Sequence, residues 1–158
     1  MVEPREFRNT VGHFATGVTV IAAEVDGEVR GMTANSFTSL SLNPPLLLFC
    51  VLKTSHMAQA IQSTPHFSVN ILQEDQQMLS TYFAGIWKGE APPPFSFTRW
   101  GEVHRLDGCS AAMACAVETI YEGGDHWIVV GRVVGLHQSD DQYRPLLFSR
   151  GKYGKLQT

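Results

Sequence analysis

A short polar segment after an apolar run holds the residues best suited to binding an anion. Residues 53–56 read Lys-Thr-Ser-His and lead into a sequence typical of a short helix. Because the first N–H groups of a helix are unpaired and carry partial positive charge, a lysine and two hydroxyls there favour a phosphate. The same residues also fit an ordinary helix N-cap beside a solvated lysine. Taken alone, the tetrapeptide leaves both interpretations open.

A second polar segment precedes the same apolar run. Residues 33–41 read Thr-Ala-Asn-Ser-Phe-Thr-Ser-Leu-Ser and are followed by Pro44 and Pro45. Such residues form polar turns, and they can equally line a slot for the edge of a flat heteroaromatic ring. Since the run Leu46–Leu52 joins the two polar segments, one extended ligand could contact both. Flavin mononucleotide, with a polar-edged ring and a phosphate, has that shape.

The motifs of self-sufficient catalysis are missing from the sequence. It contains no GxSxG elbow, phosphate-binding lysine loop, HExxH pair or dinucleotide-binding glycine fingerprint. The six histidines are scattered, so no metal site is predicted. Cys50 lies inside the apolar run and is expected to be an inert buried thiol rather than a nucleophile. An enzyme of this composition would depend on a cofactor for its chemistry.

Composition and charge limit the class of partner. The chain has 158 residues, 44% of them hydrophobic, and 12 basic against 15 acidic residues give a net charge of −3. Without a basic run, neither nucleic acid nor an anionic membrane is expected as a partner, and a negative ligand would need a local positive site. We find no signal peptide and no apolar run near the ~20 residues of a membrane span. The cysteines at 50, 109 and 115 are predicted to be reduced thiols. These features predict a cytoplasmic protein with a single domain over residues 1–158.

The elements that position these segments are mostly strands. A helix is expected from Pro4, with Phe7, Val11 and Phe14 on one face and Gly17 at its end. The run 46–52 is predicted to be a central strand buried on both faces, and residues 66–72 a strand with one wet face. Short helices are expected after Ser55 and over residues 74–85, and a loop around Pro92–Pro94. Further strands are expected at 18–25, 29–32, 97–100, 111–122, 126–138 and 145–156. This pattern predicts a mainly β, antiparallel barrel with short flanking helices.

Five stretches together resemble the short-chain flavin reductase family, over nearly the whole chain. They are FRNTVGHFATGVTVIAA, GMTANSFTSLSLNPPLLLFCVLKTS, FSVNIL, GDHWIVVGRV and PLLFSRGKYG, in this order. The resemblance implies an antiparallel split β-barrel of Greek-key, FMN-binding type, usually a homodimer. It also implies reduction of free FMN or FAD by NADH or NADPH, with the reduced flavin passed to the oxygenase component of a two-component monooxygenase.

The resemblance also implies roles for individual residues. The first motif would contact the flavin ring and ribityl chain, through Thr33, Ala34, Asn35, Ser36, Phe37, Ser39 and Ser41. The strand end and helix start would run along the flavin and hold its phosphate, through Cys50, Val51, Leu52, Lys53, Thr54 and Ser55. Tyr82 and Phe83 would lie near the far end of the flavin, and His126 of the Gly-Asp-His turn over the nicotinamide. Arg150 and Tyr153 would lie near the pyridine nucleotide or the flavin.

The implied reaction is hydride transfer from C4 of the nicotinamide to N5 of the flavin. One alternative is a split-barrel oxidase with bound FMN, of the pyridoxamine-phosphate-oxidase type, although that class has more basic residues at its phosphate site. The other alternative is a non-catalytic flavin-binding protein. His56 and the Pro92–Pro94 loop have no assigned role at this stage.

Overall fold

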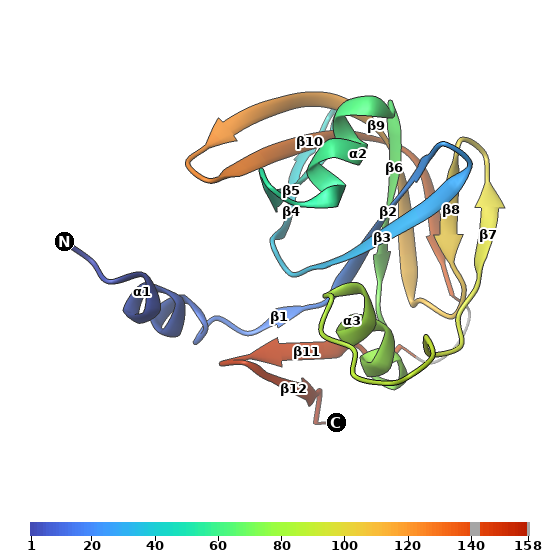
Figure 1. The fold of residues 1–158 in the computed structure, drawn as a ribbon. Coiled ribbons are helices and arrows are strands. Elements are labelled where there is room, and N and C mark those ends of the chain that lie inside the picture. The colour runs from blue at the N-terminus through green and yellow to red at the C-terminus, as the bar shows by residue number, and fades with distance from the viewer. Residues whose placement is uncertain (140–142, 158) are drawn as a thin grey trace.

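The computed structural model describes residues 1–139 and 143–157, and it is dominated by one seven-stranded antiparallel sheet (Figure 1). The order of strands in this sheet is β3-β2-β6-β9-β10-β5-β4. Their bounds are Thr19–Val25 (β2), Glu28–Ala34 (β3), Phe37–Leu42 (β4), Pro45–Leu52 (β5), His66–Ile71 (β6), Ala111–Gly123 (β9) and His126–Gln138 (β10). The prediction of a mainly β, antiparallel fold with short helices is confirmed.

The two edge strands of this sheet are neighbours in sequence. β3 ends at Ala34 and β4 begins at Phe37, so residues 35–36 carry the chain from one edge of the sheet to the other. The sheet is curled accordingly (Figure 1). Its interior is a hydrophobic core that includes Ile21, Phe49 and Phe67. The polar segment at residues 33–41 therefore lies where the two ends of the sheet approach each other.

Helix α2 (His56–Ser63) begins where the sequence predicts and packs on β2, β3 and β5. Its buried residues are Met57, Ala58, Ala60 and Ile61, the apolar face of the helix. A 3-10 turn η1 (Glu74–Gln76) and helix α3 (Gln77–Phe83) follow β6, and Gly85 at a φ of +80° succeeds α3. None of the helices in the described residues is long and apolar enough to cross a membrane.

The first helix is shorter than expected and stands apart from the sheet. α1 covers Pro4–Val11 and ends at Gly12, so the prediction that Gly17 ends it is wrong. Thr16 and Gly17 instead form strand β1, which pairs with β11. The predicted apolar face is exposed, with Phe7 61% and Phe14 78% accessible. Figure 1 shows α1 projecting at the side of the molecule next to the β11–β12 hairpin.

Two predictions about strand burial are wrong. β5 alternates, with Leu47, Phe49 and Val51 buried and Leu48 and Cys50 only partly buried. Its second face lines cavities at the sheet surface instead of a second core. The sequence predicts one wet face for β6, but Ser68 and Asn70 on that face are fully buried, because β8 (Val103–Leu106) packs over it.

Two small sheets complete the fold. β7 (Phe97–Trp100) pairs with β8, a strand that the sequence pattern did not reveal. β1, β11 (Leu146–Ser149) and β12 (Lys152–Lys155) form a three-stranded sheet. Residues 84–96, which include the three prolines, form neither helix nor strand.

Candidate functional site

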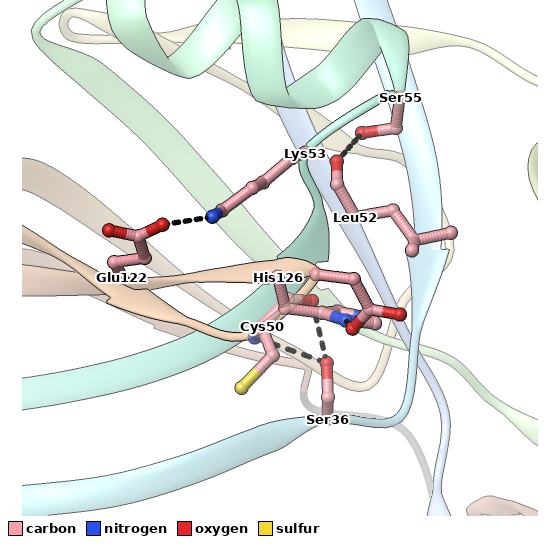
Figure 2. Close-up of polar contacts among 8 residues, drawn as sticks. Ser36, Cys50, Leu52, Lys53, Ser55, Glu122 and His126 are labelled. Atoms are coloured by element: carbon pink, nitrogen blue, oxygen red, sulfur yellow. Dashed lines mark hydrogen bonds and ion pairs between the residues drawn. The ribbon is translucent and has the colours of Figure 1, made fainter. Parts of the chain in front are cut away.

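The end of β5 and the Gly-Asp-His turn are joined directly. β10 pairs with β5 in a register that sets His126 opposite Leu52. Beyond the last pair, the backbone N–H of Lys53 donates to the carbonyl of Asp125 at 3.0 Å. The segments predicted to hold the phosphate and the nicotinamide therefore lie next to each other, at the end of β5 and the start of β10 (Figure 2).

Lys53 is held at this junction by two neighbours. Its Nζ pairs with a carboxylate oxygen of Glu122 and lies 4.8 Å from the ring centroid of Trp127. Figure 2 shows the lysine pointing toward Glu122, away from the start of α2. The hydrogen bond and the charge of Lys53 lower the pKa of Glu122. The lysine is therefore paired, and not simply solvated.

Ser55 is the N-cap of α2. Its Oγ accepts from the N–H of Ala58 at 3.1 Å and donates to the carbonyl of Leu52 at 2.8 Å. The neighbouring Thr54 is exposed. The geometry fits the N-cap interpretation of Ser55, and the exposed Thr54 lies beside the start of the helix, where an anion is favoured.

His126 is oriented by the residue before it. Its Nδ1 lies 2.7 Å from a carboxylate oxygen of Asp125, and 40% of its side chain is exposed. The hydrogen bond from His126 lowers the pKa of Asp125. An imidazole fixed on one nitrogen in this way presents its other nitrogen, Nε2, for contact with a ligand.

The hydroxyls of the 33–41 segment are partly used by the fold itself. Ser36 Oγ donates to the carbonyl of Cys50 at 2.9 Å and accepts from its N–H at 3.2 Å, as Figure 2 shows. Thr33 Oγ1 donates to the carbonyl of Ser80 at 2.6 Å. The side chains of Ala34 and Val51 belong to the core, so only their backbone can face a ligand.

One cavity of about 530 Å³ collects several of the predicted ring-binding residues. We call it the ring cavity. Its lining includes Asn35, Ser36, Phe37 and Cys50, together with Thr16, whose buried Oγ1 has no hydrogen-bond partner. An unpartnered buried hydroxyl in a cavity of this size favours a polar ligand there.

A second groove, of about 720 Å³, brings Ser55, Tyr82 and Phe83 together with His56 and Phe95. The rings of Tyr82 and Phe83 lie 5.4 Å and 5.0 Å from that of Phe95. Close packing also requires Gly31, because a Cβ at this glycine would lie 2.7 Å from the Phe83 ring. The sequence does not indicate a role for His56 or for the proline-containing loop, residues 84–96, in which Phe95 lies.

Several predicted residues line neither of these two cavities, among them Ser39, Ser41, Arg150 and Tyr153. Ser39 and Ser41 line a third, mostly apolar cavity. Tyr153 bonds through its hydroxyl to Ser80 Oγ at 2.7 Å, and Arg150 lies at the turn between β11 and β12. Nothing in the sequence distinguished these side chains from the rest of their motifs.

The three cysteines are free. Burial raises the pKa of Cys109 to about 11 and that of Cys115 to about 12, so both are unreactive thiols. Burial also raises the pKa of Cys50, although this side chain is only partly buried and faces the ring cavity. Among the described residues, no group of three or more His, Cys, Asp or Glu side chains could hold a metal ion.

Comparison with known proteins identifies the family. The model described as "Flavin reductase like domain" matches residues 11–157. The chain belongs to this flavin reductase-like family. The resemblance on the five sequence stretches is thereby confirmed.

Relatives in this family are named as flavin reductases or as reductase subunits of monooxygenases. The reductase subunit HsaB of a flavin-dependent monooxygenase from Rhodococcus jostii (strain RHA1) is 41% identical over 156 residues, which cover 96% of this chain and 77% of that protein. An NADH-dependent FAD reductase of Streptomyces globisporus is 37% identical over 161 residues, covering 97% of this chain and 87% of that protein.

Solved structures in the family agree with the fold. The flavin reductase PheA2 in its native state superposes with a TM-score of 0.93 at 40% identity, over 99% of this chain and 100% of that one. The NADH:FAD oxidoreductase SgcE6 of Streptomyces globisporus, in complex with NAD and FAD fragments, gives a TM-score of 0.88 at 35% identity, over 99% and 96% of the two chains.

Proposed function

We propose that this chain is an NAD(P)H:flavin oxidoreductase, which reduces free FMN or FAD and supplies the reduced flavin to a partner flavin-dependent monooxygenase. The observation that carries the proposal is the backbone hydrogen bond between Lys53 and Asp125. It joins the segment proposed to bind the flavin phosphate to the Gly-Asp-His turn. The names of the relatives support the same reaction, since they include NADH-dependent flavin reductases and monooxygenase reductase subunits.

The ring cavity fits a flavin by its size and by its unpartnered Thr16 hydroxyl. Asn35, Ser36, Phe37 and Cys50 would hold the ring, with Thr33, Ala34, Ser39 and Ser41 beside them along the same segment. Val51, Leu52, Lys53, Thr54 and Ser55 would follow the rest of the flavin to its phosphate, and Tyr82 and Phe83 would cover its far end.

When both carriers are bound, they supply the hydride transfer between nicotinamide C4 and flavin N5. The protein's contribution is to stack the two rings at about 3–3.5 Å and to exclude water from them. His126, fixed by Asp125, would position the nicotinamide by contact or hydrogen bond. Arg150 and Tyr153 would support the nucleotide from the C-terminal hairpin.

The decisive experiment is anaerobic mixing of the protein with NADH or NADPH and FMN or FAD. A reductase bleaches the visible absorbance of excess flavin over many turnovers, in at least one of the four combinations. A flavin-binding protein without hydride transfer leaves the absorbance unchanged, which would refute the proposal. An oxidase of the pyridoxamine-phosphate-oxidase type would instead retain FMN through purification. At most its own bound FMN would be reduced, and the excess free flavin would keep its absorbance.

The proposal extends to the assembly and its location. A homodimer is supported by the free edge of β4, which carries the exposed Leu40 and Leu42, because an exposed apolar strand edge favours association. A single domain over residues 1–158 is supported by the family match across most of that range. A cytoplasmic location is supported by the three free cysteines.

A further inference from the structure

Ser80, in helix α3, is a fully buried residue that joins two distant segments of the chain. Its Oγ and the hydroxyl of Tyr153 form a hydrogen bond of 2.7 Å. Its carbonyl accepts from Thr33 Oγ1 at 2.6 Å. Ser80 is therefore bonded on one side to β12 and on the other to the end of β3. Neither Ser80 nor Tyr153 lines the ring cavity or the second groove.

Helix α3 covers β3, which is an edge strand of the large sheet. β3 pairs with β2 on one side, so the helix supplies contacts on a side where no strand of this sheet does. The bond from Thr33 to Ser80 is one of these contacts. The ring of Phe83 is another, since a Cβ at Gly31 would lie 2.7 Å from it. The position of the end of β3 therefore depends on α3.

The two segments bonded to Ser80 lead to two parts of the lining of the ring cavity. One part consists of residues 35–38, which begin two residues after Thr33. The other part includes residues 16–19. There Thr16 pairs with Phe148 on β11, and the ring of Phe148 lies 5.2 Å from that of Tyr153. Through Ser80, the C-terminal hairpin and the polar segment at the ring cavity are thus connected.

These two parts of the lining are not held equally. On the hairpin side, β1 pairs with β11, and the N–H of Arg150 donates to the carbonyl of Gly12 at 2.7 Å. Residues 35–36, in contrast, lie between β3 and β4 and belong to neither strand. Loss of the bond between Ser80 and Tyr153 should therefore displace residues 35–36 more than the hairpin. Asn35 and Ser36 are both predicted to contact the flavin ring.

We propose that Ser80 is a positioning residue for the flavin, which together with Tyr153 and Thr33 fixes Asn35 and Ser36 at the ring cavity. A hydrogen-bond network whose buried members are satisfied holds its segments in one arrangement. This inference rests on the proposed flavin reductase function, and it adds to that function a residue that contacts no substrate. It also assigns the Tyr153 hydroxyl to α3.

The variants Ser80→Ala and Tyr153→Phe remove the same hydrogen bond from its two ends. We expect each to raise the dissociation constant for FMN by about three- to tenfold, the change that corresponds to one hydrogen bond, while KM for NADH stays within about twofold. Because the two hydroxyls act in one bond, the double variant should bind FMN about as well as the weaker single variant. Quenching of flavin fluorescence measures the dissociation constant without turnover, and steady-state kinetics give KM.

Thr33 provides a rescue test at the second bond. Thr33→Val keeps the shape of the side chain without its hydroxyl and should weaken FMN binding, whereas Thr33→Ser keeps the hydroxyl and should bind FMN like the wild type. The matched control is Ser68→Ala. Ser68 is as fully buried as Ser80, and its Oγ donates to the carbonyl of His104 at 2.6 Å, but it lines neither cavity. Its loss should lower the midpoint of urea denaturation and leave the dissociation constant for FMN unchanged.

An unchanged dissociation constant for FMN in Ser80→Ala, with a lower urea midpoint, would show a purely structural role and overturn the inference. A Tyr153→Phe variant that changes only KM for NADH would also overturn it. Where Ser80→Ala does not fold, Tyr153→Phe decides, because Tyr153 is only partly buried.

A different result would refute the proposed function itself. If the wild-type chain binds FMN but transfers no hydride to it, the reductase proposal is wrong, and the dissociation constants still decide the role of Ser80. A wild-type chain that binds neither FMN nor FAD would refute both.

Discussion

The ammonium group of Lys53 has two competing uses in this protein. It pairs with Glu122 and lies over the Trp127 ring, yet it also follows the strand that leads into the predicted phosphate site. An exposed ion pair contributes little to stability, because water and salt screen it. A phosphate with two charges can therefore displace the carboxylate. If Lys53 binds the phosphate as proposed, we expect Glu122 to compete with it and to lower the affinity for flavin.

The variant Glu122→Gln tests this competition. We expect KM for FMN to fall by about two- to fivefold, which corresponds to the energy of an exposed pair. Lys53 lowers the pKa of Glu122 below its usual range, so the carboxylate is ionised at neutral pH and the gain should be present there in full. At acidic pH the difference should shrink, as wild-type Glu122 itself becomes protonated. Steady-state kinetics at several pH values measure this.

Glu118→Gln is the control for that variant, since Glu118 lies on the same strand and pairs with Arg132 instead. It should leave KM for FMN unchanged. An unchanged or raised KM for FMN in Glu122→Gln would show that Lys53 does not bind the phosphate.

His126 makes a different prediction, because its role concerns the second substrate. His126→Ala removes a ring that Asp125 holds at 2.7 Å, so we expect KM for NADH to rise by about tenfold, the loss of about one ligand contact, and KM for flavin to stay within about twofold. Initial rates with each substrate varied in turn give both constants. His137→Ala, on the same strand β10 but outside the predicted site, is the comparison variant and should leave both constants unchanged. Equal rises in both constants would exclude a nicotinamide-specific role.

At the scale of elements, polar side chains of strand β6 hold β2 and β8 in place. Asn70 is fully buried, and its Nδ2 donates to the carbonyl of Val20 and to Ser68 Oγ, each at 3.0 Å. Its Oδ1 accepts from the N–H of Leu106 at 2.9 Å, and Ser68 Oγ donates to the carbonyl of His104 at 2.6 Å. These side chains link β6 to β2 and to β8. β6 already pairs with β2 on one side and with β9 on the other, so β8 cannot form backbone pairs with it. The side-chain hydrogen bonds hold β8 against β6 instead.

The substitution Asn70→Ala should therefore be costly. It leaves the N–H of Leu106 and the carbonyl of Val20 without their side-chain partner in the core, and we expect the free energy of unfolding to fall by about 2–4 kcal/mol. Urea denaturation followed by circular dichroism measures the loss. Asn9→Ala on the exposed helix α1 should change stability by no more than about 0.5 kcal/mol. A similarly small effect at Asn70 would mean that the network does not hold β8.

At the scale of the whole molecule, apolar surface remains uncovered at the β4 edge of the sheet. Leu42 is 91% exposed, and Val134 and Leu136 on β10 are 61% and 72% exposed. All three line the third cavity, together with Ser39 and Ser41. Contiguous exposed apolar residues of this kind are typical of an interface. We infer that a second copy of the chain covers them.

The double substitution of Leu42 and Leu136 by Asp should weaken the proposed dimer. We expect the wild type to elute as a dimer at micromolar concentration, and the variant to dissociate at least about tenfold more readily, because each charge would be buried without a partner. Light scattering after size-exclusion chromatography measures both masses. Ile86→Asp, which is exposed but does not line this cavity, should remain dimeric. A monomeric wild type would contradict the inference.

Local signals in the sequence determined much of the fold and the composition of the site. The turn at Asp26 and Gly27 was predictable because positive φ angles, here +52° and +80°, favour these residue types and set the hairpin of β2 and β3. The start of α2 at Ser55 was predictable because an N-cap depends on its own next three residues. The family motifs around Lys53 and His126 were likewise recognisable in the sequence alone.

Only the tertiary structure decided which of these residues meet. The pairing of Lys53 with Glu122, the burial of Ser68 and Asn70, and the hydrogen bond from Arg150 to Gly12 all join segments distant in sequence. Each depends on strand register and on which strand covers which face, and no local pattern encodes either. Backbone conformation is a short-range property of the chain, whereas the environment of a side chain is set by whatever the rest of the chain packs against it.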